Sequence, residues 1–255
     1  MTMFSKILGA GAVCGALALM SSPALAANVG GVIFDSGAIL KTAYLYESFP
    51  QNVGDTLDGY GSVSSIDGKA TSVFCPGCEL TVVFDGFTVT SLGDGDDFVF
   101  SGGSVRFYVD NSMDFASGAS LAAASNGALW LELAGHDFTT NGLTGSLIAE
   151  DVLLASVPGT PTNGGVAFFD VVGGLAAGNF DTNTLGGVNP NGEGDFADFI
   201  LNSSFQLALS PQDPTHPVEG TGQLQGFAVP EPATLGLMGI GLLGLGVMAR
   251  RRRRG

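Results

Sequence analysis

The sequence predicts an all-β protein, an antiparallel β-sandwich or jelly roll, with an N-terminal signal-peptide helix and a single C-terminal transmembrane helix. The chain of 255 residues contains 40 glycines and 11 prolines, and only 13% of its residues are charged, whereas an average soluble domain has roughly 25%. Short runs of alternating apolar and polar residues recur between turn residues. Many short strands separated by turns are typical of a sandwich or jelly roll.

The N-terminus has the three parts of a secretory signal peptide. Lys6 precedes an apolar run at 7–20, and the helix-breaking Ser21-Ser22-Pro23 follows. Small residues at Ala24 and Ala26 occupy the positions that signal peptidase recognises, so we expect cleavage after Ala26 and a leader at 1–26. The apolar run is shorter than the roughly 20 residues that a permanent span needs.

The alternating patterns place an all-β extracellular domain at 27–209. The clearest strands are 80–84, 105–109 and 129–133, where every second residue is apolar. Trp130 lies opposite the leucines of its strand, and we expect it to pack in the core. Segment 117–126 is alanine-rich and predicts a short helix or a long loop. Further strands are expected at 32–35, 42–47, 98–101, 151–156, 166–172 and 203–209.

The C-terminus combines a proline motif, an apolar helix and a basic tail. A Pro-containing linker at 210–229, with one more strand around 223–227, leads to Pro230-Glu231-Pro232. The uncharged segment 233–249 makes a helix of roughly 25 Å, close to a bilayer core of about 30 Å. Arginines favour the cytoplasmic side, so the domain is expected outside the cytoplasm. The basic tail consists of Arg250, Arg251, Arg252, Arg253 and Arg254.

These C-terminal residues, 230–255 in all, resemble the PEP-CTERM sorting signal, which is also catalogued as an ice-binding-protein C-terminal motif. The resemblance covers only about the last 27 residues and begins at Val229. It implies a substrate of exosortase, a membrane protease-transferase of Gram-negative bacteria that make exopolysaccharide. Pro230, Glu231 and Pro232 would be the recognition motif, and the helix with its arginines would be removed.

The resemblance also implies partners and a destination. Signal peptidase and exosortase would act on the chain during export, while it is held transiently in the inner membrane. The mature protein would reach the cell surface or the extracellular matrix, where exopolysaccharide is a further expected partner.

The charge distribution argues against nucleic acid as a partner. Residues 27–229 contain only three basic residues, Lys41, Lys69 and Arg106, and all the acidic residues of the chain except Glu231. Binding a nucleic acid needs a basic face that displaces counterions. The central domain offers none.

Cys75 and Cys78 form a CxxC motif, for which three interpretations exist. A redox centre would sit at a helix N-terminus in a βαβ unit, but this motif lies at a Pro-Gly turn between two predicted strands. A zinc site would need two more ligands, and the chain has only two histidines, His136 and His216. A local disulfide therefore fits an oxidising compartment best.

We expect no metal or other cofactor, with calcium as the weaker alternative. Oxygen-bearing side chains gather in two turns, and the second resembles the first part of a calcium loop, but Ile200 stands where a bidentate glutamate belongs. Such residues are also common turn formers. The two turns contain Asp94, Asp96 and Asp97, and Asn189, Asn191, Glu193 and Asp195.

The sequence carries no recognisable catalytic motif. A GxSxG elbow, an HExxH motif and a P-loop are all absent. We therefore expect a non-enzymatic surface or extracellular-matrix protein associated with exopolysaccharide or biofilm. A carbohydrate-binding or calcium-dependent adhesive module, with Tyr108 and Trp130 as aromatic candidates, is the alternative, and a secreted hydrolase is a weaker one.

Overall fold

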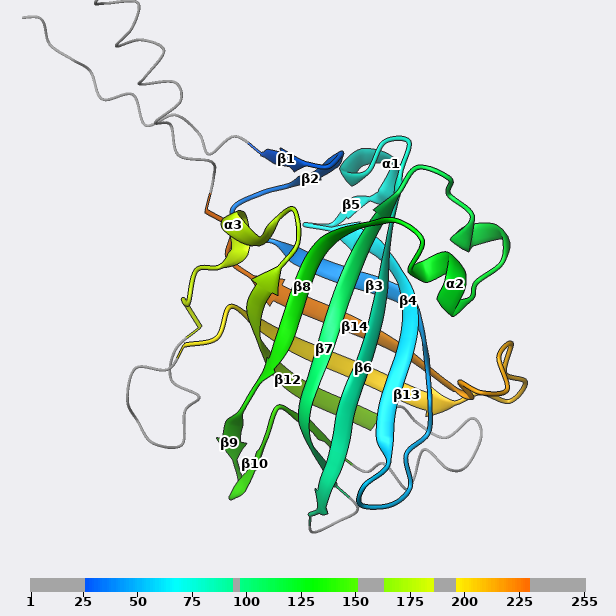
Figure 1. Ribbon diagram of the computed structural model, residues 1–255, viewed down its shortest axis with the longest axis vertical. Coiled ribbons are helices and arrows are strands. Elements are labelled where there is room, and N and C mark those ends of the chain that lie inside the picture. Colours follow the sequence, from blue (N-terminus) through cyan, green and yellow to red (C-terminus); the bar gives the residue numbers. More distant parts are fainter. Residues whose placement is uncertain (1–25, 94–96, 151–162, 186–195, 230–255) are drawn as a thin grey trace, which may run out of the picture.

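The computed structural model describes residues 26–93, 97–150, 163–185 and 196–229. Their main feature is one antiparallel sheet that closes on itself (Figure 1). The path runs β12-β13-β14-β3-β4-β6-β7-β8, and β8 then pairs with β12. The strands of this barrel-like sheet are β3 (Ile39–Glu47), β4 (Thr56–Ile66), β6 (Glu79–Leu92), β7 (Phe98–Asp110), β8 (Ala128–His136), β12 (Asn163–Gly173), β13 (Phe199–Leu207) and β14 (Val218–Gly226).

The all-β prediction is confirmed, but the predicted two-layer sandwich or jelly roll is not what the structure shows. A sandwich needs two separate sheets, whereas here each strand of the path hydrogen-bonds to a neighbour on both sides. Register shifts interrupt several of the ladders, among them β3 with β4 and β6 with β7. Bulges of this kind increase local twist and let a sheet curl into a closed shape.

The longest strands follow the predicted alternation. In β6 and β7 the side chains of Leu80, Phe84 and Phe107 are buried in the interior. The two strands predicted at 98–101 and 105–109 are one strand, β7, with Gly102 and Gly103 at positive φ between them. An added Cβ at Gly103 would lie 2.3 Å from the ring of Phe87, so this glycine makes room for the ring across the sheet.

Strand β4 was not predicted. Its inward positions include Gly59 and Gly61, against which the side chains of Phe84 and Leu45 pack. These glycines interrupt the apolar alternation that identifies a strand in a sequence. The strand is held instead by its ladders to β3 and β6.

The expected linker at 210–229 is largely part of the domain. Strand β14 occupies Val218–Gly226 and pairs with both β13 and β3. Its sequence contains three glycines and four polar residues, so it resembles a linker in composition, and only the last few residues were expected to form a strand. Because β14 is hydrogen-bonded to both β13 and β3, residues 218–226 cannot act as a spacer between the domain and the tail.

Short elements cover the end of the barrel at which β3 begins. They are β1 (Ala27–Val29), β2 (Val32–Phe34), β5 (Lys69–Ala70), α1 (Thr71–Phe74) and α3 (Ala177–Phe180). Trp130 is fully buried there, as expected, with its ring 5.8 Å from that of Phe34 and 5.7 Å from that of Phe180. Its Nε1 donates a hydrogen bond to the Val29 carbonyl at 3.0 Å. This end is therefore plugged by aromatic side chains.

The remaining short elements lie outside the closed sheet or extend it. They are η1 (Phe115–Ser117), α2 (Leu121–Ala124), β9 (Phe138–Thr140), β10 (Leu143–Gly145) and β11 (Leu147–Ala149). Helix α2 lies in the stretch where a short helix or loop was expected. In the described part of the chain, no helix has both the length and the hydropathy to cross a bilayer. The strand expected at 151–156, the leader up to residue 25 and the C-terminal helix lie outside the described residues.

Replacing Gly103 tests whether the close approach of the Phe87 ring to this glycine is needed for the sheet to close. Gly103→Ala is expected to lower the free energy of unfolding by about 2–4 kcal/mol, because the new Cβ meets Phe87 and the backbone has φ +90°. Chemical denaturation measures this change. Gly118→Ala is the control, since its Cβ would meet nothing within 4 Å, and a change within about 0.5 kcal/mol is expected. Equal effects of the two substitutions would contradict this account of β7.

Candidate functional site

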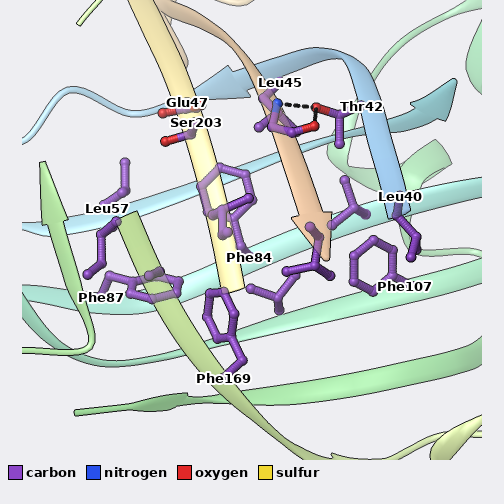
Figure 2. Close-up of a pocket in the computed structure, with 17 residues that line it drawn as sticks. Leu40, Thr42, Leu45, Glu47, Leu57, Phe84, Phe87, Phe107, Phe169 and Ser203 are labelled. Atoms are coloured by element: carbon purple, nitrogen blue, oxygen red, sulfur yellow. Dashed lines mark hydrogen bonds between the residues drawn. The ribbon is translucent and has the colours of Figure 1, made fainter. Parts of the chain in front are cut away.

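The interior of the barrel contains a cavity of about 80 Å³ (Figure 2). A closed sheet of eight strands is just wide enough to be filled by side chains or to hold one small ligand. The lining is mainly aliphatic and aromatic, with polar side chains from Thr42, Glu47 and Ser203. A second cavity of about 50 Å³ lies towards the end of the barrel opposite the aromatic plug, where Phe49 and Pro50 contribute to its wall.

Glu47 lies at the boundary between these cavities and contributes to the walls of both. It is the last residue of β3 and follows Leu45 on the inward face, with Tyr46 packed in a separate cluster on the outer face. The residue is 9% exposed. Figure 2 shows its carboxyl group on the same side of the cavity as the Ser203 hydroxyl.

Gly220 on the neighbouring strand makes room for this carboxyl. An added Cβ at Gly220 would lie 2.4 Å from Oε1 of Glu47. Gly220 pairs with Leu45 in the ladder of β14 and β3, and the register shifts immediately after it. The glycine and the irregular ladder together leave space for a polar group inside an apolar barrel.

Burial raises the pKa of the Glu47 carboxyl from 4.5 to about 7. Removal from water disfavours the charged form of a carboxylic acid. Among the described residues, no side chain or backbone group forms a hydrogen bond with this carboxyl, and no basic side chain lines either cavity. The site therefore combines an apolar space with one acidic group whose hydrogen-bonding capacity is unused.

The other polar groups of the cavity have protein partners. The Thr42 hydroxyl accepts a hydrogen bond from the Gly222 N–H at 2.6 Å and donates to its carbonyl oxygen at 3.3 Å, as the dashed lines in Figure 2 show. The Ser203 hydroxyl donates to the Gly165 carbonyl at 3.4 Å. These two hydroxyls bridge strands, and Glu47 is left as the group available to a ligand.

The histidines are held by aspartates rather than assembled into a triad. His216 Nε2 lies 3.0 Å from Asp58 and Nδ1 lies 2.8 Å from Asp213. Asp213 also accepts hydrogen bonds from Thr215 and Tyr60, and the bond from the Thr215 hydroxyl is the main reason why the pKa of Asp213 lies well below its usual value. This network fastens the β13–β14 connection to β4.

His136 forms a separate pair. Its Nδ1 lies 2.9 Å from the Asp170 carboxylate, across the ladder that joins β8 to β12. The two histidines thus contact different aspartates.

Three carboxylates come close together beside α2. One oxygen each from Glu79, Asp110 and Asp114 lies within 4.8 Å of the others. Burial raises the pKa of Glu79, although the Phe115 N–H donates to its Oε1 at 3.1 Å. The buried Oδ1 of Asp114 has no hydrogen-bond partner in the described segments. Hard cations such as Ca²⁺ prefer oxygen ligands of this type.

The structure describes some of the residues singled out in the sequence and leaves others outside the described ranges. Cys75 and Cys78, at the turn between α1 and β6, are joined in a disulfide. Asp97 is described, but Asp94, Asp96 and the acidic turn at 189–195 lie outside the described residues, as do Ala24 and the entire C-terminal motif from Pro230. Ala26 is described and exposed, one residue before β1.

Glu47 and the carboxylate cluster were both missed from the sequence. A signal for Glu47 existed, since it follows Leu45 on the buried face of a predicted strand and a charged residue there breaks the pattern. The sequence contained no signal for the carboxylate cluster, because Glu79 comes close to Asp110 and Asp114 only when β6 pairs with β7.

Comparison with known proteins identifies one feature of the chain. Residues 228–254 match the PEP-CTERM protein-sorting motif, as the C-terminal residues led us to expect. No curated protein and no solved structure matches the chain. The motif covers the tail and leaves the activity of the barrel unassigned.

Replacing the interior carboxyl should stabilise the protein in a pH-dependent way. A pKa raised from 4.5 to about 7 means that folding favours the protonated form, so wild-type stability falls as pH rises through this window. Glu47→Gln removes that loss and is expected to raise the free energy of unfolding by about 2–3 kcal/mol at pH 8, with little effect at pH 4.

Denaturation across this pH range measures the difference between the two proteins. Glu219→Gln is the matched control, because this substitution makes the same chemical change at a residue on the outward face of β14. Equal stability of wild type and Glu47→Gln at pH 8 would show that the carboxyl is solvated.

Proposed function

We propose that this chain is an exported, non-enzymatic protein that exosortase processes and delivers to the cell surface or extracellular matrix of a Gram-negative bacterium. The match to the PEP-CTERM sorting motif carries the proposal, because this motif implies recognition by exosortase and processing at the membrane. A signal peptide ending at Ala26 would begin the export, and a span at 233–249 with Arg250–254 on the cytoplasmic side would hold the chain until processing.

The fold fits processing at both ends. The first strand begins at Ala27, directly after the proposed signal-peptidase site, so removing the leader leaves β1 intact. The last strand ends at Gly226, and the sorting motif begins at residue 228. Cleavage at the Pro-Glu-Pro region would release the complete barrel.

Both ends of the described domain lie on the plugged end of the barrel. The Ala228 N–H donates to the Ser36 carbonyl at 2.8 Å, and the Val229 N–H donates to the Asn179 carbonyl at 2.8 Å. Ser36 follows β2, and Asn179 lies in α3. The proposed recognition motif therefore starts one residue beyond a point where the chain is hydrogen-bonded to the domain.

A non-enzymatic role agrees with the chemistry of the barrel. The carboxyl of Glu47 has no second acid in the described walls of its cavities, whereas glycoside hydrolysis needs a pair. Exopolysaccharide is the proposed partner in the matrix. Of the two aromatic candidates for a carbohydrate-binding module, Trp130 is fully buried and Tyr108 is half-buried.

Intact mass spectrometry of the protein from membrane and extracellular fractions of the native host tests the proposal. The extracellular form is expected to lack residues 1–26 and everything after the Pro-Glu-Pro region. Replacing Pro230, Glu231 and Pro232 together by alanine should leave the protein in the membrane fraction with its arginine tail. The control replaces Pro211, Pro214 and Pro217 by alanine and should be processed normally. An extracellular wild-type form that retains Arg250–254 would contradict the proposal.

Calcium-dependent adhesion is the second candidate, and the carboxylates of Glu79, Asp110 and Asp114 favour it. This function predicts that millimolar CaCl₂ raises the melting temperature, because a cation that binds only the folded state stabilises it. Glu79→Gln should abolish the rise, and Glu219→Gln should preserve it. No calcium-dependent rise in the wild type, measured by scanning calorimetry, would remove this candidate.

A further inference from the structure

The interior cavities have features of a binding site that the sorting function does not explain. The first extends from Leu40 and Leu224, near the aromatic plug, to Glu47, and the second continues from Glu47 to Phe49 near the opposite rim. Binding in these cavities would be independent of export.

The space suits a small molecule. The cavities measure about 80 and about 50 Å³ and share Glu47, Leu57, Leu147 and Ser203 in their walls. An apolar cavity of about 150 Å³ admits a ligand the size of benzene. A molecule of roughly six non-hydrogen atoms is therefore the size class that fits.

The lining sets the chemistry of the occupant. Apart from Glu47, Thr42 and Ser203, the first cavity is walled by hydrocarbon side chains and glycine. The two hydroxyls already bridge strands, so the cavity-lining polar group that lacks a partner in the described structure is the carboxyl of Glu47, a residue that is 9% exposed. A ligand that complements it has an apolar body and one hydrogen-bond donor.

A protonated amine complements this carboxyl better than a neutral donor does. Hydrogen bonds between ionised partners are roughly twice as strong as those between neutral ones. No basic residue lines either cavity, so a cation there has no competitor within the described walls. An ammonium group neutralises the ionised carboxylate, whereas a neutral ligand leaves that charge uncompensated and an anionic ligand adds a second negative charge.

We propose that the barrel binds a small aliphatic monoamine, with its ammonium group on the Glu47 carboxylate and its alkyl chain in the apolar cavity towards Phe107 and Leu224. Gly220 is part of the site, because its missing side chain leaves the carboxyl room to meet the ligand.

The binding has a defined pH dependence. Glu47 is the titratable residue among those lining the two cavities; the other lining residues, from β3, β4, β6, β7, β11, β12, β13 and β14 and the segment 48–50, carry no titratable side chain. An alkylamine stays protonated throughout the range in which this carboxyl ionises. Affinity is therefore expected to rise between pH 5.5 and pH 8.

The test uses n-pentylamine and its neutral isostere 1-pentanol, each with six non-hydrogen atoms. Each is titrated into the full chain in lipid nanodiscs, with empty nanodiscs as the blank, by calorimetry and ligand-observed NMR. We expect 1:1 binding of pentylamine at pH 8 that is about 10- to 100-fold tighter than that of pentanol. Glu47→Gln should reduce pentylamine affinity to the level of pentanol and abolish its pH dependence.

Two further variants locate the site. Ala167→Leu, which adds bulk to the cavity wall and leaves Glu47 in place, should prevent binding of both compounds. Leu201→Phe serves the same purpose if the first variant does not fold. Glu219→Gln should bind as the wild type does. The proposal is overturned if pentylamine does not bind, if it binds Glu47→Gln as tightly as the wild type, or if a folded cavity-filling variant retains binding.

Discussion

The structure depends on the ladder that joins β8 to β12 and so closes the sheet. Residues 132–136 of β8 pair with 168–173 of β12, and this pairing turns an open sheet with two exposed edges into one whose main strands all have partners on both sides. Exposed edges invite pairing with other chains. Closure removes these edges from the eight main strands.

Closure also determines what the interior can be. In an open sheet, the side chain of Glu47 would face solvent on one surface, and its carboxyl would be an ordinary acid. Inside the closed sheet Glu47 is 9% exposed, and Phe49, Leu57 and Leu147 line the same cavity; this burial raises the pKa of its carboxyl to about 7. Ionisation of a buried carboxyl without a partner lowers the stability of the folded state progressively as pH rises from about 4.5 to about 7. The aromatic plug around Trp130, at the other end, offsets such a cost, because large rings bury much apolar area.

The sequence predicted those parts of the fold that depend on local pattern. Alternation identified β6, β7 and β8, and the tail identified the sorting motif. The prediction of strands from this alternation failed where a glycine occupies an inward position that is usually apolar. Gly59 and Gly61 in β4, and Gly220 and Gly222 in β14, provide space that Phe84, Leu45, Glu47 and Leu201 occupy from other strands.

Closure and the internal site could not be predicted for a related reason. Whether a set of strands forms one barrel or two packed sheets depends on where bulges fall and which distant strands pair, and periodicity contains neither. The Glu47 site required that β3, β13 and β14 become neighbours, although β13 lies more than 150 residues further along the chain.

The arrangement of the two ends gives the barrel a direction. The chain enters at β1 and leaves after β14 at the plugged end, where Ala228 and Val229 are hydrogen-bonded to the domain. Glu47, Phe49 and Pro50 lie at the opposite end, because β3 runs away from the plug along its whole length. The cavity at this end is therefore lined by residues that lie far in the fold from the hydrogen bonds of Ala228 and Val229.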